Sequence, residues 1–408
     1  MRKLPLALAQ MTLSLALCLM MLAPSVGPAE ANAGFKKWIN GFYGVARKNG
    51  ISRKTYNKAF AGITSPDPEV IRFTRHQPEF RQKMWMYFDS RVNEDSIERG
   101  REMKAKWKKW LDVIERKYGV DRNILLAIWS MESSYGEYLQ RPASKRSIIR
   151  SLATLAYQDK RRRKFARRQL ISALKILQSG RVTTAHLTGS WAGAMGHTQF
   201  IPSSYILYGQ DMDGDGRKDI WDSVPDALAT AANLLKRNGW RTGQTWGYEV
   251  QGKRWGKSAG KTRTIAQWAK AGLKRTKGRE FKRSATRAEL RYLAGKSGPA
   301  FLLLKNFFVI KRYNNSDKYA LAVGHLADQI AGHGDFDRQL PRPYRKLDKE
   351  ERMALQTALG RLGLYDGKID GKIGSGTRAA IRNAQDRLGM NPDGYESPKL
   401  LKRLQNKT

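Results

Sequence analysis

One stretch of the sequence places a carboxylic acid where it could serve as a general acid. Residues 124–136 read ILLAIWSMESSYG, and Glu132 falls on the same helical stripe as Leu125 and Ile128, at i, i+3 and i+7. A carboxyl group on an apolar face is poorly hydrated, which raises its pKa and keeps it protonated near neutral pH. General acid catalysis requires that property. The alternative interpretation is a helix-terminal glutamate paired with one of the many Lys or Arg residues.

The residues on either side of this acid predict the helix that holds it. Asp121 is a good N-cap, and Val120 and Leu125 have the spacing of a hydrophobic staple. Gly136 supplies a stop just beyond the acid. A short helix between Asp121 and Gly136 is therefore expected, with Glu132 in its last turns.

Helical periodicity also dominates the rest of the chain. Amphipathic helices are expected at 97–118 as one long segment, 148–158, 165–178, 225–239 and 319–331. Residues 240–255 have the Gly-punctuated alternation of a small hairpin, and 301–310 read as a buried strand or two. The fold class predicted from these patterns is mainly α with a small β element.

A second stretch, residues 189–205 (GSWAGAMGHTQFIPSSY), combines small residues with hydrogen-bonding side chains. Its glycines and alanines let the backbone approach a ligand closely, while Gln199, Ser203 and Ser204 offer polar groups. Such a segment suits the floor of a binding cleft. The alternative is a tight turn between packed helices.

Residues 211–222 (DMDGDGRKDIWD) follow the spacing of a twelve-residue calcium loop. An Asp at the twelfth position, where Glu is usual, and Lys218 at the eighth depart from that pattern, and Asp219 occupies the ninth. The alternative is a metal-free Asp/Gly turn. The ligands expected from the spacing are the carboxylates of Asp211, Asp213, Asp215 and Asp222 and the backbone carbonyl of Arg217.

The composition indicates a basic protein of more than one domain. At 408 residues, the chain is longer than one hydrophobic core usually serves, so two or three domains are expected. Hydrophobic residues make up 41%, which excludes a disordered chain. The formal net charge of +40 implies an anionic partner. The densest basic run, residues 160–168, is interpreted as a solvated helix face, with an electrostatic contact as the alternative.

Residues 1–33 read as a secretory signal peptide. Two basic residues begin the chain, residues 13–22 form an apolar run, and residues 31–33 (ANA) form a cleavage site. The apolar run is too short for a spanning helix. A lipid anchor on Cys18, the only cysteine, is the weaker alternative, because apolar residues continue past it. In an exported protein, the anionic partner would be a cell-wall polymer or a membrane surface rather than nucleic acid.

The end of the chain reads as a separate module. Residues 339–347 (QLPRPYRKL) have the Pro-containing, basic composition of a linker. Three short helices are expected beyond it, at 349–362, 376–388 and 398–404. The predicted organisation is thus a domain over 34–338, a linker over 339–347 and an appendage over 348–408.

Four blocks of sequence, taken in order, resemble a known family. They are AIWSMESSYG around Glu132, GSWAGAMGHTQFIPSSY from 189, DMDGDGRKDIWDSVPDALATAANLLKRNGW from 211 and RYNNSDKYALAVGHLADQI from 312. Together they resemble the lytic murein transglycosylases of the membrane-bound B family, whose domain is distantly similar to goose-type lysozyme. Ser133 stands where that family commonly has Thr, and His197 where Gln or Tyr is common. The tail resembles a three-helix peptidoglycan-binding module.

This resemblance implies roles for particular residues. Glu132 would be the single catalytic acid and base. The calcium-type loop matches a family feature, which implies a stabilising Ca²⁺ and no catalytic cofactor. Six side chains fall on positions that line the sugar cleft of the family: Tyr87, Ser190, Gln199, Tyr313, Asn314 and Tyr319.

The resemblance also implies a reaction that needs one carboxylate instead of the usual two. The enzyme would cut the β-1,4 bond between N-acetylmuramic acid and N-acetylglucosamine in peptidoglycan without water. Glu132 would protonate the leaving oxygen while the substrate's N-acetyl oxygen stabilises the cationic centre, and would then take the proton of the C6 hydroxyl as a 1,6-anhydro ring closes. Ser190 and Asn314 would orient the acid and the N-acetyl group.

Three other functions remain open from the sequence. A muramidase would hydrolyse the same bond, a non-catalytic scaffold would only bind the wall, and an exported nucleic-acid binder is permitted by the charge alone. No nucleic-acid motif supports specific binding of that kind. We expect a periplasmic monomer that binds peptidoglycan glycan strands, with electrostatic contact to a membrane or anionic polymer.

Overall fold

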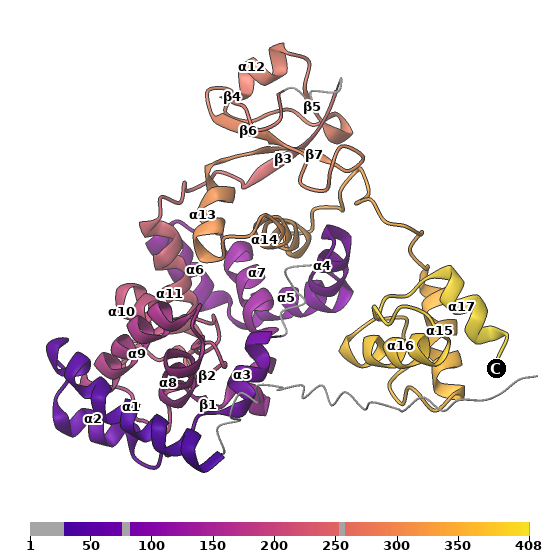
Figure 1. Ribbon diagram of the computed structural model, residues 1–408. Helices are drawn as coiled ribbons and strands as arrows, with labels where there is room; N and C mark the ends of the chain where they lie inside the picture. The colour runs from indigo at the N-terminus through magenta and orange to yellow at the C-terminus, as the bar shows by residue number, and fades with distance from the viewer. Residues whose placement is uncertain (1–27, 76–81, 253–257, 408) are drawn as a thin grey trace, which may run out of the picture.

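Residues 28–75, 82–252 and 258–407 are described by a computed structural model. The protein is mainly helical, as predicted, and Figure 1 shows a large helical body, a small sheet above it and a module of three helices, in yellow, beside it. Among those residues, no helix combines the length and apolar character needed to cross a bilayer. Most of the predicted signal peptide, including Cys18, lies outside the described residues, and helix α1 begins at Pro28.

The helical body contains most of the secondary structure. Its helices are α1 (Pro28–Lys48), α2 (Arg53–Phe60), α3 (Pro68–Arg75), α4 (Met84–Arg91), α5 (Glu94–Lys106), α6 (Lys108–Tyr118), α7 (Arg122–Ser133), α8 (Ile148–Gln158), α9 (Arg163–Gln178), α10 (Pro202–Tyr208), α11 (Val224–Arg237), α13 (Lys305–Tyr313) and α14 (Asp317–Ile330). Two short 3₁₀ helices (Glu137–Gln140 and Pro142–Ser144) lead to the antiparallel pair β1 (Arg146–Ser147) and β2 (Thr188–Gly189).

Helix α7 is the central helix of this body. It packs against α5, α6, α11 and α14, and every side chain from position 124 to 131 is buried. The side chain of Asp121 accepts a hydrogen bond from the backbone N–H of Asn123 at 2.7 Å, as expected of the predicted N-cap. A helix that is apolar all round needs neighbours on every side, so α7 is held rigidly.

The single long helix predicted over 97–118 is wrong. The chain forms α5 and α6 instead, separated at Trp107, whose φ and ψ of −100° and 17° leave the helical region. The break lets α5 pack on α7 and α14, while α6 packs on α11. One straight helix could not follow both surfaces.

The sheet above the body is more extensive than the small hairpin predicted at 240–255. Its five strands are antiparallel in the order β4-β6-β7-β3-β5. Strand β3 pairs with β5 and β7 from later segments, with Tyr248 opposite Leu302. The strand read in 301–310 ends at Leu303, and α13 follows it. The elements of this part are β3 (Gly247–Gln251), β4 (Thr262–Thr264), α12 (Ile265–Lys270), β5 (Lys274–Arg275), a 3₁₀ turn (Thr276–Gly278), β6 (Arg287–Arg291) and β7 (Ala300–Leu303).

The C-terminal module has the three helices predicted from the sequence: α15 (Lys349–Arg361), α16 (Ser375–Arg387) and α17 (Pro398–Gln405). Its own small core includes Leu355, Leu359, Ile381, Leu400 and Leu404, each of them fully buried. Asp348 caps α15 with a capping box, and Ser397 caps α17. The module therefore has a hydrophobic core of its own between its three helices.

Helix α4 is the surface of the body against which the module packs. The ring of Trp85 lies 5.0 Å from the ring of Tyr395 and 5.6 Å from that of Tyr344. The phenol of Tyr395 donates a hydrogen bond to the carbonyl oxygen of Met86 at 2.8 Å. Aromatic residues of the linker and the module thus cover one face of α4.

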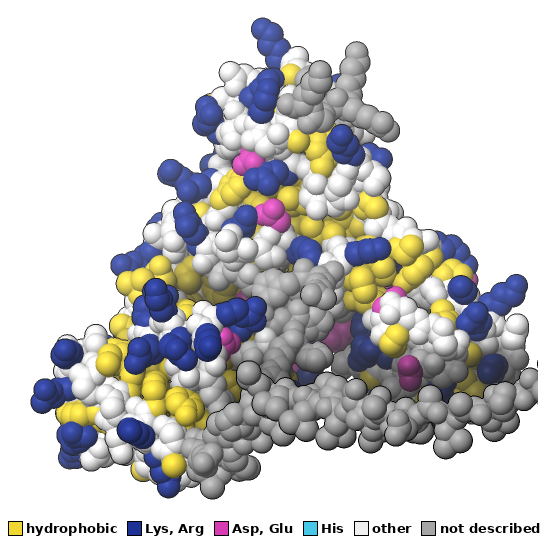
Figure 2. All heavy atoms as spheres, viewed as in Figure 1, with side chains coloured by type: hydrophobic (Ala, Val, Ile, Leu, Met, Phe, Trp, Pro, Cys, Tyr) yellow, Lys and Arg dark blue, Asp and Glu magenta, His cyan; other side chains and the backbone are white. Residues whose placement is uncertain are grey.

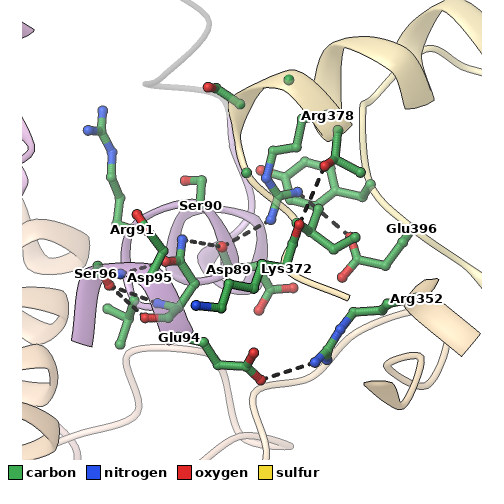
Figure 3. Close-up of a pocket in the computed structure, with 18 of the residues that line it drawn as sticks. Asp89, Ser90, Arg91, Glu94, Asp95, Ser96, Arg352, Lys372, Arg378 and Glu396 are labelled. Carbon is green, nitrogen blue, oxygen red and sulfur yellow. Dashed lines mark hydrogen bonds and ion pairs between the residues drawn. The ribbon is translucent and has the colours of Figure 1, made fainter. Parts of the chain in front are cut away.

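A buried ion pair adds to this contact. Arg342 of the linker donates two hydrogen bonds to the carboxylate of Asp89, at 2.9 and 3.1 Å, and both side chains are about one tenth exposed. Arg378 of the module donates to the carbonyl oxygen of Asp89 at 3.0 Å, and Arg352 pairs with Glu94 at 3.0 Å (Figure 3). A cleft of about 1120 Å³ remains between α4, α5 and the loops of the module.

The surface carries the basic character of the composition. Lys and Arg side chains are spread over the face shown in Figure 2, and far fewer Asp and Glu side chains are visible there. Helix α9 begins within the basic run 160–168, and most basic side chains of that run are exposed. The run is therefore solvent-exposed, which both interpretations of it require.

Candidate active site

Glu132 lies in the last turn of α7 and points toward α14. The phenol of Tyr319, the third residue of α14, donates a hydrogen bond to Oε1 of Glu132 at 2.6 Å. Tyr319 is 3% exposed and Glu132 is half-buried. Packing of α7 on α14 therefore brings together an acid and a donor that stand 187 positions apart in the sequence.

The backbone turns sharply immediately after the acid. Ser134, Tyr135 and Gly136 all have positive φ, at 50°, 58° and 92°, so α7 ends three residues before the stop predicted at Gly136. Left-handed backbone at non-glycine residues costs free energy and persists only where the surroundings enforce it. A Cβ at Gly136 would lie 2.5 Å from Cε1 of His197, so the close approach of these two segments requires glycine.

A second tyrosine extends the site. The rings of Tyr313 and Tyr319 are stacked, with centroids 6.4 Å apart and planes 9° from parallel. The phenol of Tyr313 donates to the carbonyl oxygen of Thr198 at 2.5 Å, which ties the end of α13 to the segment 189–205. Burial, and secondarily the negative charge of Glu132, raise the pKa of both phenols well above 10. Both tyrosines are therefore neutral donors.

The segment 189–205 packs as tightly as its composition predicts. A Cβ at Gly189 would lie 2.1 Å from the carbonyl oxygen of Ala194, and one at Gly196 would lie 2.3 Å from that of Ile220. Ser190 follows β2 directly, and its hydroxyl accepts hydrogen bonds from the backbone N–H groups of Ala194 and Ala192. The segment is a tight turn, and its carbonyl oxygens at 197 and 198 accept hydrogen bonds from Ser133, next to the acid, and from Tyr313.

Gln199 and His197 join this segment to the end of α7. Gln199 has a φ of 50°, and its side-chain amide donates to the carbonyl oxygen of Gly196 at 2.8 Å. The hydroxyl of Ser133 donates to the carbonyl oxygen of His197 at 2.6 Å. The residue after the catalytic candidate is thus hydrogen-bonded to the segment 189–205.

The side chain of His197 has a role that the sequence did not reveal. Its Nδ1 accepts a hydrogen bond from Nε1 of Trp129 at 3.1 Å, and the two rings meet edge to face. Burial lowers the pKa of His197 to about 4, so the imidazole is neutral near neutral pH. The only sequence signal was that His197 and Ser133 both depart from the family pattern, and the structure places these two residues in contact.

The other two predicted cleft residues lie at the margin of this group. Tyr87 on α4 is half-buried, and α4 packs against α14. Asn314 is exposed and follows α13 directly. Residues 305–313 are helical, so Asn314 lies in a turn between α13 and α14, and most of the strand predicted at 301–310 is absent.

The predicted calcium loop gathers a different set of carboxylates from the one expected. Oxygen atoms of Asp211, Asp213 and Asp226 lie within 4.8 Å of one another. Asp222 lies instead with His186 and Asp219, and its side chain is 79% exposed. Asp215 pairs with the guanidinium of Arg217 at 2.9 Å.

Asp226 lies four residues beyond the twelve-residue template, which is why the spacing did not identify it. It is fully buried in the first turn of α11 and accepts hydrogen bonds from the backbone N–H groups of Met212 and Asp219, at 2.6 and 2.7 Å. Burial raises the pKa of Asp226 to about 6, and the charge of Asp213 adds to the shift. Three converging carboxylates offer the oxygen donors that a hard cation such as Ca²⁺ prefers.

Comparison with known proteins identifies the family. Residues 34–328 match the family described as Transglycosylase SLT domain, and residues 348–404 match the peptidoglycan binding domain family. The chain therefore belongs to the SLT-domain transglycosylases. It belongs to those members that carry a C-terminal peptidoglycan-binding domain.

Individual relatives agree with this assignment. Membrane-bound lytic murein transglycosylase B of Escherichia coli (strain K12) is 33% identical over an alignment of 301 residues that covers 70% of this chain and 80% of that protein. The structure of SltB3 from Pseudomonas aeruginosa in complex with NAG-anhNAM-pentapeptide is similar with a TM-score of 0.71 and 41% identity, over 91% of this chain and 99% of that one. The Escherichia coli transglycosylase SLT35 in complex with calcium has a TM-score of 0.61 and 28% identity, over 75% and 95% of the two chains.

Proposed function

We propose that this protein is a lytic transglycosylase that cleaves the β-1,4 bond between N-acetylmuramic acid and N-acetylglucosamine in peptidoglycan and leaves 1,6-anhydromuramic ends. The observation that carries the proposal is the hydrogen bond from Tyr319 to Glu132, made inside the region that matches the transglycosylase family. A relative 41% identical in sequence was solved with a peptide-bearing NAG-anhNAM ligand, which is the product class expected of this reaction.

Glu132 acts first as the acid and then as the base. Its protonated carboxyl gives the proton to the leaving glycosidic oxygen, while the substrate's own N-acetyl oxygen stabilises the cationic sugar. The resulting carboxylate then takes the proton of the C6 hydroxyl, and that oxygen closes the anhydro ring. Because Tyr319 is neutral and donates to Oε1, it stabilises the carboxylate form between the two steps.

The surrounding residues bind the sugar. We assign to the cleft the side chains of Tyr87, Ser190, Gln199, Tyr313, Asn314 and Tyr319. Ser190 and Asn314 orient the acid and the N-acetyl group. The stacked rings of Tyr313 and Tyr319 keep water from the carboxyl group and connect α14 to the segment 189–205.

Asp211, Asp213 and Asp226 hold a structural Ca²⁺, with the backbone carbonyl of Arg217 as a further ligand. Asp226 replaces the predicted ligand Asp222, since Asp226 is the carboxylate gathered with Asp211 and Asp213. SLT35, a relative of this chain, was solved with calcium. The ion has no part in bond cleavage and fixes the loop that leads into α11.

The chain as a whole acts at the cell wall. Residues 1–33 direct export to the periplasm and are removed, residues 34–338 form the catalytic domain, and residues 339–347 link it to the peptidoglycan-binding module at 348–408. The protein acts as a monomer on glycan strands, without specific nucleic-acid binding, and its high positive charge adds contact with anionic polymers or membranes.

Mass spectrometry of the products formed from purified peptidoglycan tests this function. The mature protein should release anhydromuropeptides, and Glu132→Gln should release none while still binding glycan. Glu137→Gln is the matched control, because Glu137 is an exposed glutamate paired with Arg99 and Arg141. Reducing-end products would indicate a muramidase, and the absence of products from the unmodified protein would indicate a wall-binding scaffold.

A further inference from the structure

A histidine and two aspartates outside the catalytic site form a second cluster of metal-binding donors. We infer that His186, Asp219 and Asp222 bind a divalent transition-metal ion, with Zn²⁺ as the best match. Atoms from the three side chains lie within 4.8 Å of one another. This inference does not depend on the proposed function.

The distances suit a small ion with nitrogen and oxygen ligands. Nε2 of His186 lies 3.5 Å from Oδ1 of Asp219 and 3.8 Å from Oδ2 of Asp222. Ligands bound to Zn²⁺ at about 2.1 Å in a tetrahedron stand roughly 3.4 Å apart. Only small side-chain shifts would therefore place all three donor atoms on one ion, with the fourth position open to water.

The imidazole nitrogen faces the two carboxylates without forming a hydrogen bond to either of them. Although the ring of His186 is about one third exposed, its Nε2 is buried and makes no hydrogen bond within the described residues. A buried polar atom that makes no hydrogen bond is uncommon in a folded protein and needs an explanation. A metal ion between this nitrogen and the two carboxylates supplies one.

Two of the three ligands are held in place before any ion binds. The ring of His186 packs on Trp221 with centroids 5.2 Å apart, and Nε1 of Trp221 donates to the carbonyl oxygen of Thr188 at 2.8 Å. Oδ1 of Asp219 accepts hydrogen bonds from the backbone N–H groups of Trp221 and Asp222, both at 2.9 Å. Asp222 is exposed and supplies the adjustable third ligand.

The donor set separates this cluster from the calcium-type group beside it. Asp211, Asp213 and Asp226 offer only oxygen atoms, whereas the second cluster contains an imidazole, which favours Zn²⁺ and related ions over Ca²⁺. The two groups are adjacent, because the backbone N–H of Asp219 donates to Oδ2 of Asp226 at 2.7 Å. Each ion would therefore stabilise the loop that the other needs.

An ion at this position would link the residues before strand β2 to the loop that precedes α11. His186 stands two residues before strand β2, which leads directly to Ser190. Asp219 and Asp222 belong to the loop that precedes α11. A metal bridge between them would limit the motion of β2 and raise the melting temperature without entering the catalytic chemistry.

Isothermal titration of the untagged chain with Zn²⁺, in excess Ca²⁺, tests the inference, with Co²⁺ absorption as a second readout. We expect one Zn²⁺ per chain, and at least tenfold weaker binding in His186→Gln and in Asp222→Asn. His333→Gln is the matched control, because His333 faces a single carboxylate, Asp328, at 3.6 Å and should leave the affinity unchanged.

Two results would overturn the inference. One is the absence of saturable Zn²⁺ binding, which would make the cluster an ion pair of a protonated imidazole with two carboxylates. The other is Zn²⁺ binding and a Co²⁺ spectrum that both variants leave unaltered. Circular dichroism shows whether the variants fold, and Asp222→Asn, an exposed position, keeps the test valid if His186→Gln does not.

Discussion

Tyr319 donates a hydrogen bond from its phenol to Oε1 of Glu132 across 2.6 Å, and this bond joins two largely buried helices, α7 and α14. The bond is available in both states of the acid, but it is stronger when Glu132 is a carboxylate, because charge-assisted hydrogen bonds are about twice as strong as neutral ones. It therefore acts mainly on the state that forms after proton transfer.

Tyr319→Phe should accordingly lower kcat more than it raises KM. Loss of one hydrogen bond to a charged group costs about 1.5–3 kcal/mol, which corresponds to a ten- to hundredfold lower rate. Tyr56→Phe is the control. This substitution also removes a buried phenolic hydrogen bond, the one to the carbonyl oxygen of Ile39, but at a position far along the chain from the acid. Steady-state rates on isolated glycan strands measure the effect, and an equal loss of kcat in both variants would contradict the assignment.

Gly136→Ala should destabilise the protein strongly. The substitution adds a Cβ 2.5 Å from Cε1 of His197 and places it on a residue with a φ of 92°. Gly180→Ala provides the comparison, because Gly180 has a similar φ of 74°, but no atom of the described residues lies within 4 Å of the added Cβ. Left-handed backbone alone costs about 1 kcal/mol, so a larger loss in Gly136→Ala, measured by urea unfolding, reports the close approach. Equal losses of unfolding free energy in the two variants would mean that His197 moves away from the added Cβ at no cost.

Acid should destabilise the protein through His197. Its pKa is lowered from 6.5 to about 4 by burial, so between these values the unfolded chain binds more protons than the native one. The free energy of unfolding then falls as the pH drops from about 6.5 toward 4, by at most about 3 kcal/mol from this group. His197→Gln removes that dependence. The melting temperatures of the unmodified protein and of His197→Gln should therefore become more similar as the pH is lowered from 7 to 5. A constant difference over that range would show that His197 does not contribute.

The parts of this site that could be predicted from the sequence depend on local signals. The N-cap Asp121 and the inward stripe that contains Leu125 and Ile128 are set by spacing of a few residues, and the structure agrees with both. The three helices of the C-terminal module are also local, since capping residues such as Asp348 mark their starts. Short-range patterns of this kind need no knowledge of what packs against them.

The parts that were missed depend on distant partners. Strand β3 pairs with β7, which lies about fifty residues later in the sequence. The segment 240–255 therefore has the composition of a hairpin but does not form one. The break at Trp107 follows from the packing of α5 and α6 on different helices. Asp226 lies outside the loop template, and only the fold of α11 brings it back to Asp211. Nothing near these residues in the sequence encodes the contact.

Asp89→Ala should release the C-terminal module from the body. The substitution leaves the guanidinium of Arg342, which is 11% exposed, without the carboxylate that accepts its two hydrogen bonds. Breaking a buried pair in this way costs about 3–5 kcal/mol. We expect a larger radius of gyration in solution scattering and a separate melting transition for the module. Lys372→Ala, which breaks an exposed pair with Glu98, should change neither, and a compact Asp89→Ala would show that the aromatic contacts of Trp85 suffice.

Removal of the metal should show whether Asp226 or Asp222 is the calcium ligand. If Asp211, Asp213 and Asp226 hold the Ca²⁺, then a calcium chelator should lower the melting temperature of the unmodified protein and of Asp222→Asn by the same amount. Asp226→Asn should show no response to Ca²⁺, because it removes the buried carboxylate of the group. Calcium should also bind more weakly below pH 6, since protons compete for a carboxyl group whose pKa is raised to about 6. Loss of the Ca²⁺ response in Asp222→Asn, with the response retained in Asp226→Asn, would restore the ligand set that the twelve-residue spacing predicts.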